Sequence, residues 1–165
     1  MGNLTTYLKS CIWLWVPPLV ASFIFWPNLG AAYQPDEFWR EIPWTLGVIE
    51  NFTRVALIVL SMFMVLDWRT RPQRIGLFIY AIGLMLYVAC QWVIVLEPDG
   101  WWANSAVGFL APAYTPLVWM VGIGLIGGQT MVPHLPWRRW YFAAVAGLFL
   151  SAHFTHAFLV FSRLD

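Results

Sequence analysis

The chain has 165 residues, of which 61% are hydrophobic and 10% are charged, and its formal net charge is +1. Soluble domains are about 45–50% apolar and about 25% charged, so this composition excludes an ordinary soluble domain. The near-neutral charge supplies no strongly basic surface, and we expect no nucleic-acid partner. An all-α membrane helix bundle fits the composition, and we expect a single transmembrane domain over residues 1–165.

Five hydrophobic runs are candidates for membrane-spanning helices. A helix needs about 20 apolar residues to cross the hydrocarbon core of a bilayer. The predicted spans are 11–27, 44–66, 75–96, 107–132 and 140–161, with an outer loop over 28–43. Two prolines interrupt the first run and two the fourth, which predicts either a kink or a late helix start. These prolines are Pro17, Pro18, Pro112 and Pro116.

Basic residues gather on one side of these five spans, with Arg40 and Arg163 as the two exceptions. Lys9 precedes the first span, the connection 67–74 carries three arginines, and the connection 133–139 carries two more. Short cytoplasmic segments of membrane proteins are enriched in Lys and Arg. We therefore expect a cytoplasmic N-terminus, an outer C-terminus and a multi-pass protein of a bacterial inner membrane.

Ionisable side chains inside the second run are the first functional signal. Glu50, Asn51 and Arg54 occur there, although such groups are costly within a membrane and by default face a cavity or a partner. Glu50 and Arg54 are four residues apart, so they share a helix face and can pair. At about 1.5 Å per residue they lie roughly 9 and 15 Å below the outer end of the run.

Three other runs place polar side chains at a similar depth. These are Tyr87 and Gln91 in the third run, Tyr114 and Thr115 in the fourth, and His153 and His156 in the fifth. Four helices therefore contribute to one polar layer in the outer half of the bilayer, and we expect a shared ligand-binding pocket. Trp92 and Trp119 are candidates for lining it.

The two histidines also raise the question of a metal. His153 and His156 are three residues apart, on one helix face, and with Glu50 they could supply zinc or iron ligands. Without further acidic or histidine side chains nearby, we expect hydrogen-bonded core histidines and no metal site. The sequence identifies no cofactor.

Small residues predict where helices pack closely. Gly122, Gly124 and Gly127 match a dinucleotide-binding pattern, but that pattern requires a preceding strand and an aqueous helix start. We expect close helix packing through Gly124 and Gly128 instead. The fifth run has a small-residue face, which we also expect to pack against a neighbour. Its members are Ala143, Ala144, Gly147 and Ser151.

The polar layer suggests first a binding protein for a lipid or small amphiphile. Arg54 would meet an anionic or carbonyl group, Glu50 would position Arg54, and the histidines would donate hydrogen bonds. The chain could also be an accessory subunit, with the polar face against a partner helix. Expected partners are therefore membrane lipids, a partner membrane subunit or a second copy of the chain.

Two alternatives remain open at this point. A membrane enzyme acting on a lipid or isoprenoid would use Glu50 or a histidine as general acid or base. Proton or ion translocation would use the same groups as a relay. That route needs further polar groups toward the cytoplasm, where the sequence offers Ser61, Tyr80 and Gln129.

Overall fold

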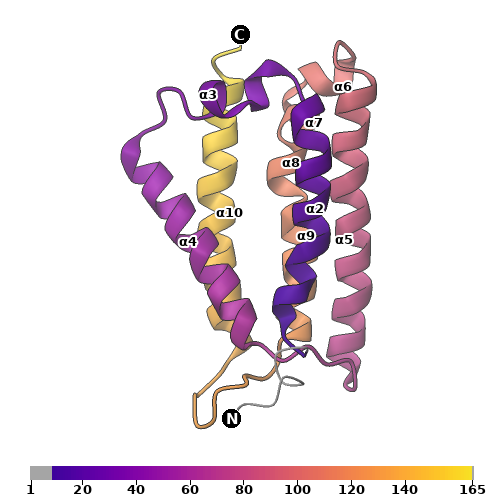
Figure 1. Ribbon diagram of the computed structural model, residues 1–165, viewed down its shortest axis with the longest axis vertical. Helices are drawn as coiled ribbons and strands as arrows, with labels where there is room; N and C mark the ends of the chain where they lie inside the picture. The colour runs from indigo at the N-terminus through magenta and orange to yellow at the C-terminus, as the bar shows by residue number, and fades with distance from the viewer. Residues whose placement is uncertain (1–8, 165) are drawn as a thin grey trace.

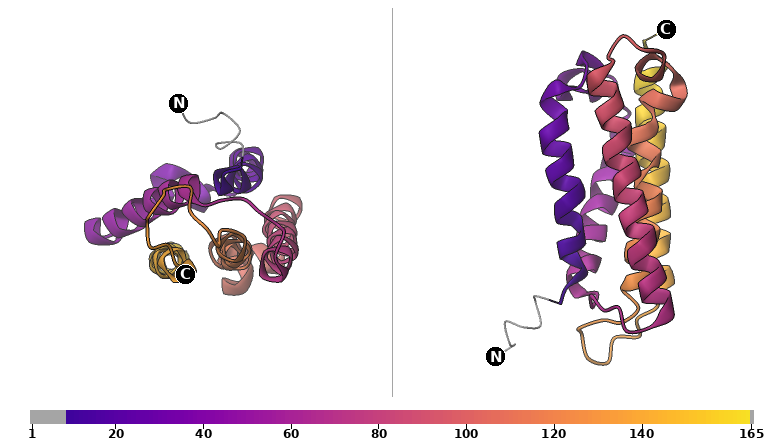
Figure 2. Two further views of the ribbon diagram at one scale, coloured as in Figure 1. Left: turned by 90° about the horizontal axis from the view of Figure 1, so that it is seen from below. Right: turned by 90° about the vertical axis from the view of Figure 1, so that its right-hand side faces the viewer.

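The computed structural model describes residues 9–164 and shows an all-α bundle in two layers. Figure 1 shows the helices side by side, and Figure 2 shows α2 and α4 in one layer with α5, α9 and α10 in the other. The elements, with η for a 3₁₀ helix, are η1 Cys11–Trp15, α2 Val16–Phe25, η2 Trp26–Asn28, η3 Ala31–Tyr33, α3 Pro35–Phe38, α4 Trp44–Phe63, α5 Arg71–Leu96, α6 Trp101–Asn104, α7 Ala106–Phe109, α8 Ala111–Tyr114, α9 Pro116–Ile126 and α10 Arg139–Phe161.

Four helical segments are long and apolar enough to cross a membrane. They are Cys11–Asn28 with 18 residues, Trp44–Phe63 with 20, Arg71–Leu96 with 26 and Arg139–Phe161 with 23. A span of the hydrocarbon core needs about 20 helical residues. The first segment combines η1, α2 and η2. Pro17 and Pro18 lie in the first turn of α2, which confirms the prediction that the α-helix starts late, at these prolines.

The fourth predicted span differs from the expectation of one helix over 107–132. It is divided into α7, α8 and α9, with a proline in the first turn of both α8 and α9. A proline removes one helical hydrogen bond and favours a new helix start. Helical structure ends at Ile126, and the apolar stretch Ala111–Ile126 is shorter than the four long segments. A fifth membrane crossing therefore stays a prediction.

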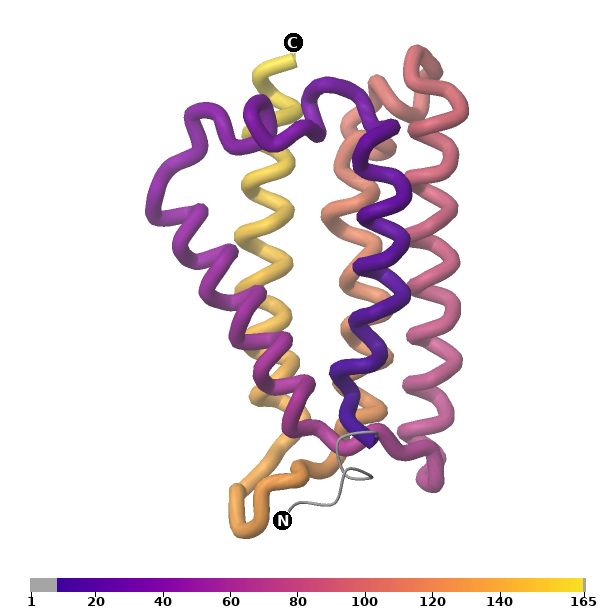
Figure 3. Tube along the Cα trace, viewed as in Figure 1, coloured from indigo at the N-terminus to yellow at the C-terminus, as the bar shows by residue number. Residues whose placement is uncertain are grey.

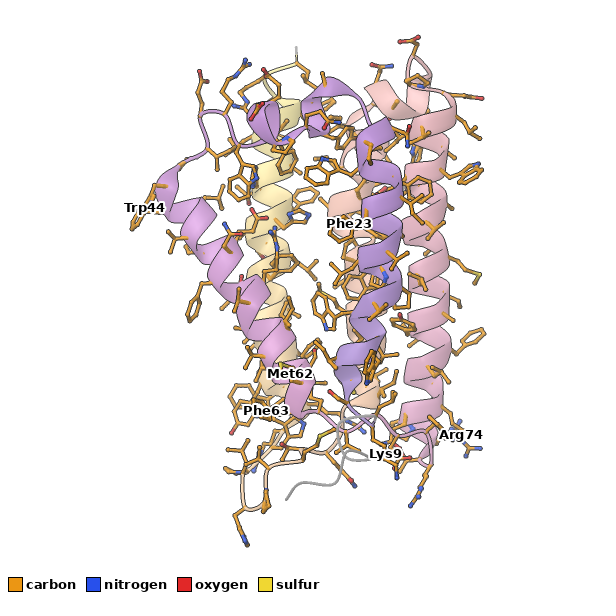
Figure 4. All side chains as sticks on the ribbon, in the orientation of Figure 1. Lys9, Phe23, Trp44, Met62, Phe63 and Arg74 are labelled. Carbon is orange, nitrogen blue, oxygen red and sulfur yellow. The ribbon has the colours of Figure 1, made fainter. Side chains whose placement is uncertain are left out.

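The two ends of the bundle differ in charge. Figure 4 shows Lys9 and Arg74 at the same end, which we call the basic end; Arg139 begins α10 there. The opposite end, which we call the acidic end, holds the connections with Asp36, Glu37, Glu97 and Asp99.

Glycines set the close approach of α5 to α9. A Cβ at Gly76 would lie 2.8 Å from the carbonyl oxygen of Gly122, and a Cβ at Gly122 would lie 2.6 Å from the backbone nitrogen of Tyr80. A Cβ at Gly83 would collide with the backbone of Trp119. Close packing through the fourth run is therefore confirmed, with Gly122 against α5 and with Gly124 and Gly128 against side chains of α10.

Gly124 and Gly128 face other side chains. A Cβ at Gly124 would meet the ring of Phe142 at 3.3 Å, and one at Gly128 would meet the guanidinium of Arg139. The small-residue face of α10 does not pack against another helix of the described chain, because Ala143, Ala144 and Ser151 are exposed and a Cβ at Gly147 would meet nothing within 4 Å. The buried face of α10 carries aromatic, alanine and histidine side chains instead.

The basic end is closed by hydrogen bonds between three chain segments. The Cys11 amide donates to the carbonyl of Met64 at 2.9 Å, and the Val65 amide donates to Gln129 at 2.9 Å. The Trp15 indole donates to the Ser61 hydroxyl at 2.8 Å. These contacts attach α4 to η1 and to the connection that follows α9. Figure 3 shows α4 inclined to the other long helices and nearest to them at this end.

The α5–α9 contact gives a first prediction. Gly83→Ala should lower the thermal stability of the purified protein in detergent, because overpacking a tight contact costs about 1–3 kcal/mol. Gly147→Ala is the matched control and should leave the melting temperature unchanged or higher, because the added methyl group meets open space. Equal melting temperatures for both variants would contradict the close α5–α9 contact.

Candidate functional site

The carboxylate of Glu50 is the centre of a polar cluster between α4 and α10. Glu50 is fully buried, and its Oε1 accepts from the Arg54 guanidinium and lies 3.0 Å from Nδ1 of His153. Its other oxygen, Oε2, lies 2.6 Å from Nδ1 of His156, which is also fully buried. Three side chains from α4 and α10 therefore share one carboxylate. We call these three side chains together with Glu50 the Glu50 cluster.

Helical spacing explains why these residues meet. Residues three or four apart lie on one helix face, and the buried face of α4 consists of Glu50, Thr53, Leu57 and Ser61. Three of these four side chains are polar. In a membrane, polar and small side chains hold helices together, since lipid offers no hydrophobic drive for helix association. The α4–α10 contact is consistent with this rule.

The segment before α4 covers the cluster from the acidic end. Nε2 of His156 lies 2.9 Å from the carbonyl oxygen of Phe38. The rings of Phe38 and Trp39 lie with their centroids 4.3 and 4.5 Å from the His156 ring. The Arg163 guanidinium donates to the carbonyl of Arg40, which attaches the same segment to the end of α10.

Aromatic contacts fix the remaining two members of the cluster. The His153 ring stacks on Phe149 with an interplanar angle of 9° and a centroid distance of 5.4 Å. The Arg54 guanidinium carbon lies 5.6 Å from the centroid of the same Phe149 ring, which is within the range of a cation–π interaction. Phe149 therefore orients both Arg54 and His153.

Two neighbouring cavities lie beside the cluster. The first has a volume of about 260 Å³ and is lined by Arg54 and His153 together with apolar and aromatic side chains of η1, α2, α8, α9 and α10. The second has a volume of about 180 Å³ and extends toward the acidic end. Both cavities share Ser22, Tyr87, Pro112 and His153 as lining residues. They are contiguous, and His153 lies where they meet.

The wall opposite the cluster carries hydroxyl groups. The Ser22 hydroxyl donates to the carbonyl of Pro18 at 2.9 Å, so the Tyr87 hydroxyl, 2.7 Å away, donates to Ser22. Gln91 lines the second cavity and donates to the Tyr87 carbonyl. Tyr33 lines it as well and donates to the Phe109 carbonyl; burial raises the pKa of this hydroxyl, which keeps it protonated.

One wall residue has an unused hydrogen-bond donor. Trp119 is buried, with 4% of its surface exposed, and it lines the first cavity. Its Nε1 has no acceptor among the residues that the structure describes. Buried polar groups are normally satisfied, so an orphan donor at a cavity calls for an explanation.

The structure brings six of the nine predicted site residues to the cluster or the cavities. Glu50, Arg54, His153 and His156 form the cluster, and Tyr87 and Gln91 line the cavities from α5. The other three are Asn51, Tyr114 and Thr115. Asn51 donates to the Gly47 carbonyl and accepts from Arg54, so it lies beside the cluster. Tyr114 and Thr115 donate to nearby backbone carbonyls, and the Thr115 hydroxyl also lies 3.8 Å from Sγ of Cys90 on α5. None of the three lines either cavity.

Sequence reasoning identified some cavity residues and missed others. Trp119 lines the first cavity as expected, whereas Trp92 is 55% exposed and packs edge-on against Phe25. Ser22 was missed, although a lone serine in an apolar run is a usable signal. The Phe38 carbonyl could not be found from sequence, because a backbone group leaves no residue-type signal.

The histidines do not form a metal site within residues 9–164. No group of three His, Cys, Asp or Glu side chains in this part of the chain has an arrangement that could hold a metal ion. Nδ1 of both His153 and His156 faces the Glu50 carboxylate. The three candidate metal ligands, Glu50, His153 and His156, are therefore hydrogen-bonded to one another through the carboxylate.

Comparison of the chain with protein-family models, with curated proteins and with solved structures finds no match. The class of the protein follows from its helices alone. Four helical segments in residues 9–164 are long and apolar enough to cross a membrane, which indicates a multi-pass membrane protein of the all-α type.

The cluster gives a second prediction. Glu50→Ala should lower the free energy of unfolding by about 3–5 kcal/mol, the cost of removing one partner from a buried charged pair. Glu97→Ala, the same substitution at an exposed position, is the control and should have little effect. Chemical denaturation in detergent, followed by circular dichroism, measures both. Equal stability of the two variants would show that Glu50 is not buried among charged partners.

Proposed function

We propose that the protein binds a lipid or small amphiphile in the two cavities beside the Glu50 cluster. The observation that carries this proposal is that Arg54 and His153, both held by a buried carboxylate, line a cavity whose other walls are mostly apolar and aromatic. Ligand pockets commonly combine an apolar lining with a few fixed polar groups. An amphiphile matches both parts.

The proposal includes a placement in the membrane. The basic end is cytoplasmic by the usual distribution of Lys and Arg, so the cluster and cavities belong to the outer half of the bilayer. The stretch Ala111–Ile126 with its flanking turns makes a fifth crossing, in a bacterial inner membrane. Membrane lipids are the primary partners, and a partner subunit or second copy covers exposed apolar helix faces.

Blocking the cavity tests this function. Leu19 is exposed and lines the first cavity, whereas the neighbouring Val20, equally exposed, lines neither. Leu19→Trp should therefore reduce crosslinking of diazirine-bearing fatty acid and monoacylglycerol probes to cavity residues, and Val20→Trp should not. Peptide mass spectrometry locates the crosslinks. If neither probe crosslinks to the cavity in the wild-type protein, the binding function is wrong.

A membrane enzyme is the second candidate, and the arrangement of His153 favours it. Nδ1 of His153 lies against a buried carboxylate, and within residues 9–164 its Nε2 makes no hydrogen bond to protein. A carboxylate that orients a histidine, with the other nitrogen open to a cavity, is a common arrangement for a general base. Glu50 lines neither cavity, so its role would be to position His153.

Turnover would distinguish the enzyme from the binding protein. Wild-type protein and His153→Gln are incubated with a membrane lipid extract, and lipid masses are compared by chromatography and mass spectrometry. The binding function predicts the same lipid masses in both samples. A product that depends on His153 would favour the enzyme.

Proton or ion translocation has less support. Ser61 and Tyr80, two buried groups toward the basic end that could continue a relay, already have structural partners. Ser61 donates to the Leu57 carbonyl and accepts from Trp15, and Tyr80 donates to the Leu14 carbonyl.

A further inference from the structure

We propose that the ligand is a single-chain amphiphile with an anionic oxygen headgroup, a carboxylate or a phosphate, which binds beside Arg54. This inference rests on the proposed binding function and adds the chemical class of the ligand. It follows from a count of protons and charges in the Glu50 cluster, together with the donors that line the first cavity.

His156 fixes the first part of the count. Its Nε2 lies 2.9 Å from the Phe38 carbonyl oxygen, which can only accept, so Nε2 carries a proton. Its Nδ1 lies 2.6 Å from Oε2 of Glu50, and a hydrogen bond between them requires one more proton. The pair is either imidazolium with carboxylate or imidazole with carboxylic acid. In both cases its two charges sum to zero.

The charge of Arg54 is then left over. Glu50 is the one acidic residue within the four long helical segments and Ala111–Ile126, and its charge is already balanced by His156. The remaining contacts of Arg54, with the Asn51 amide oxygen and the Phe149 ring, bring no negative charge. An unbalanced charge within a membrane is costly. The cluster therefore attracts an anion.

The cavity provides the donors that such an anion needs. Arg54 lines the first cavity and donates without accepting. A carboxylate or phosphate has several acceptor oxygens and can accept charge-assisted hydrogen bonds from the guanidinium. An ammonium headgroup would meet the positive charge of Arg54, and an alcohol would leave that charge unbalanced.

The size of the site favours one alkyl chain. Ligand pockets are commonly about 300–1,000 Å³ in volume, whereas the two contiguous cavities have volumes of about 260 and 180 Å³. This space suits a headgroup and a single chain better than a lipid with two chains. The apolar and aromatic walls on α2, α8 and α9 would contact the chain.

Probes that share one tail test the headgroup. Native mass spectrometry of the full chain in a non-ionic detergent, at a pH at which the fatty acid is ionised, measures binding of palmitic acid, hexadecyl phosphate, hexadecanol and hexadecylamine. Inorganic phosphate and acetate are the tail-free arms. At least one of the two anionic amphiphiles should bind about tenfold or more tightly than hexadecanol, because a charge-assisted hydrogen bond is lost in the alcohol.

Two variants test the residues. Arg54→Gln should remove the preference for the anionic probes, while the matched control Arg71→Gln, exposed at the basic end, should keep it. The wild-type probe series keeps the test decisive if Arg54→Gln does not fold, because it compares the headgroups on an unchanged protein.

The outcomes separate the two proposals. If hexadecanol binds in the cavity as tightly as the anions, or hexadecylamine binds more tightly, the anionic headgroup is wrong and the binding function survives. If acetate binds as tightly as palmitic acid, or inorganic phosphate as tightly as hexadecyl phosphate, the ligand is not an amphiphile. The anionic character of the ligand then stands. If no probe binds, both proposals fail.

Discussion

The burial of one carboxylate, Glu50, constrains much of this structure. A carboxylate within a bilayer requires partners, and here they come from α4 itself and from α10. Through His156 the same contacts reach the Phe38 carbonyl, so they also fix the segment that precedes α4. The orientations of Arg54 and His153 at the cavity follow from this one requirement.

Helix contacts within a layer and between the two layers are made by different means. Backbones of α5 and α9 approach closely because Gly76, Gly83 and Gly122 leave room for them. The α4–α10 contact instead depends on polar side chains, and the inclination of α4 leaves its acidic-end residue Trp44 directed away from the bundle (Figure 4). In lipid there is no hydrophobic drive for helices to associate, so close packing at glycines and hydrogen bonds between helices determine which helices pair.

The sequence was sufficient to predict the class of protein and the side chains that meet in the Glu50 cluster. The hydrophobic runs predicted the long helices, and the spacing of Glu50 with Arg54 and of His153 with His156 predicted which side chains share a face. The division of the fourth run was less certain, because a proline is compatible with a kink or with a new helix start.

Contacts between helices were the harder part. Depth along a helix could be counted, but the rotation of each helix about its axis could not. For that reason Tyr114 and Thr115 were grouped with the cluster, although they bond to nearby backbone carbonyls. For the same reason the small-residue face of α10 was expected to pack against a neighbour, whereas it is exposed in the described chain.

A double-mutant cycle between Glu50 and His156 tests the central claim most directly. The free energies of unfolding of Glu50→Ala, His156→Ala and the double variant are compared with that of the wild-type protein. Residues in one buried network show coupling of about 0.5–3 kcal/mol, and we expect a value in the upper part of this range. Additive effects would mean that the carboxylate and the imidazole do not meet.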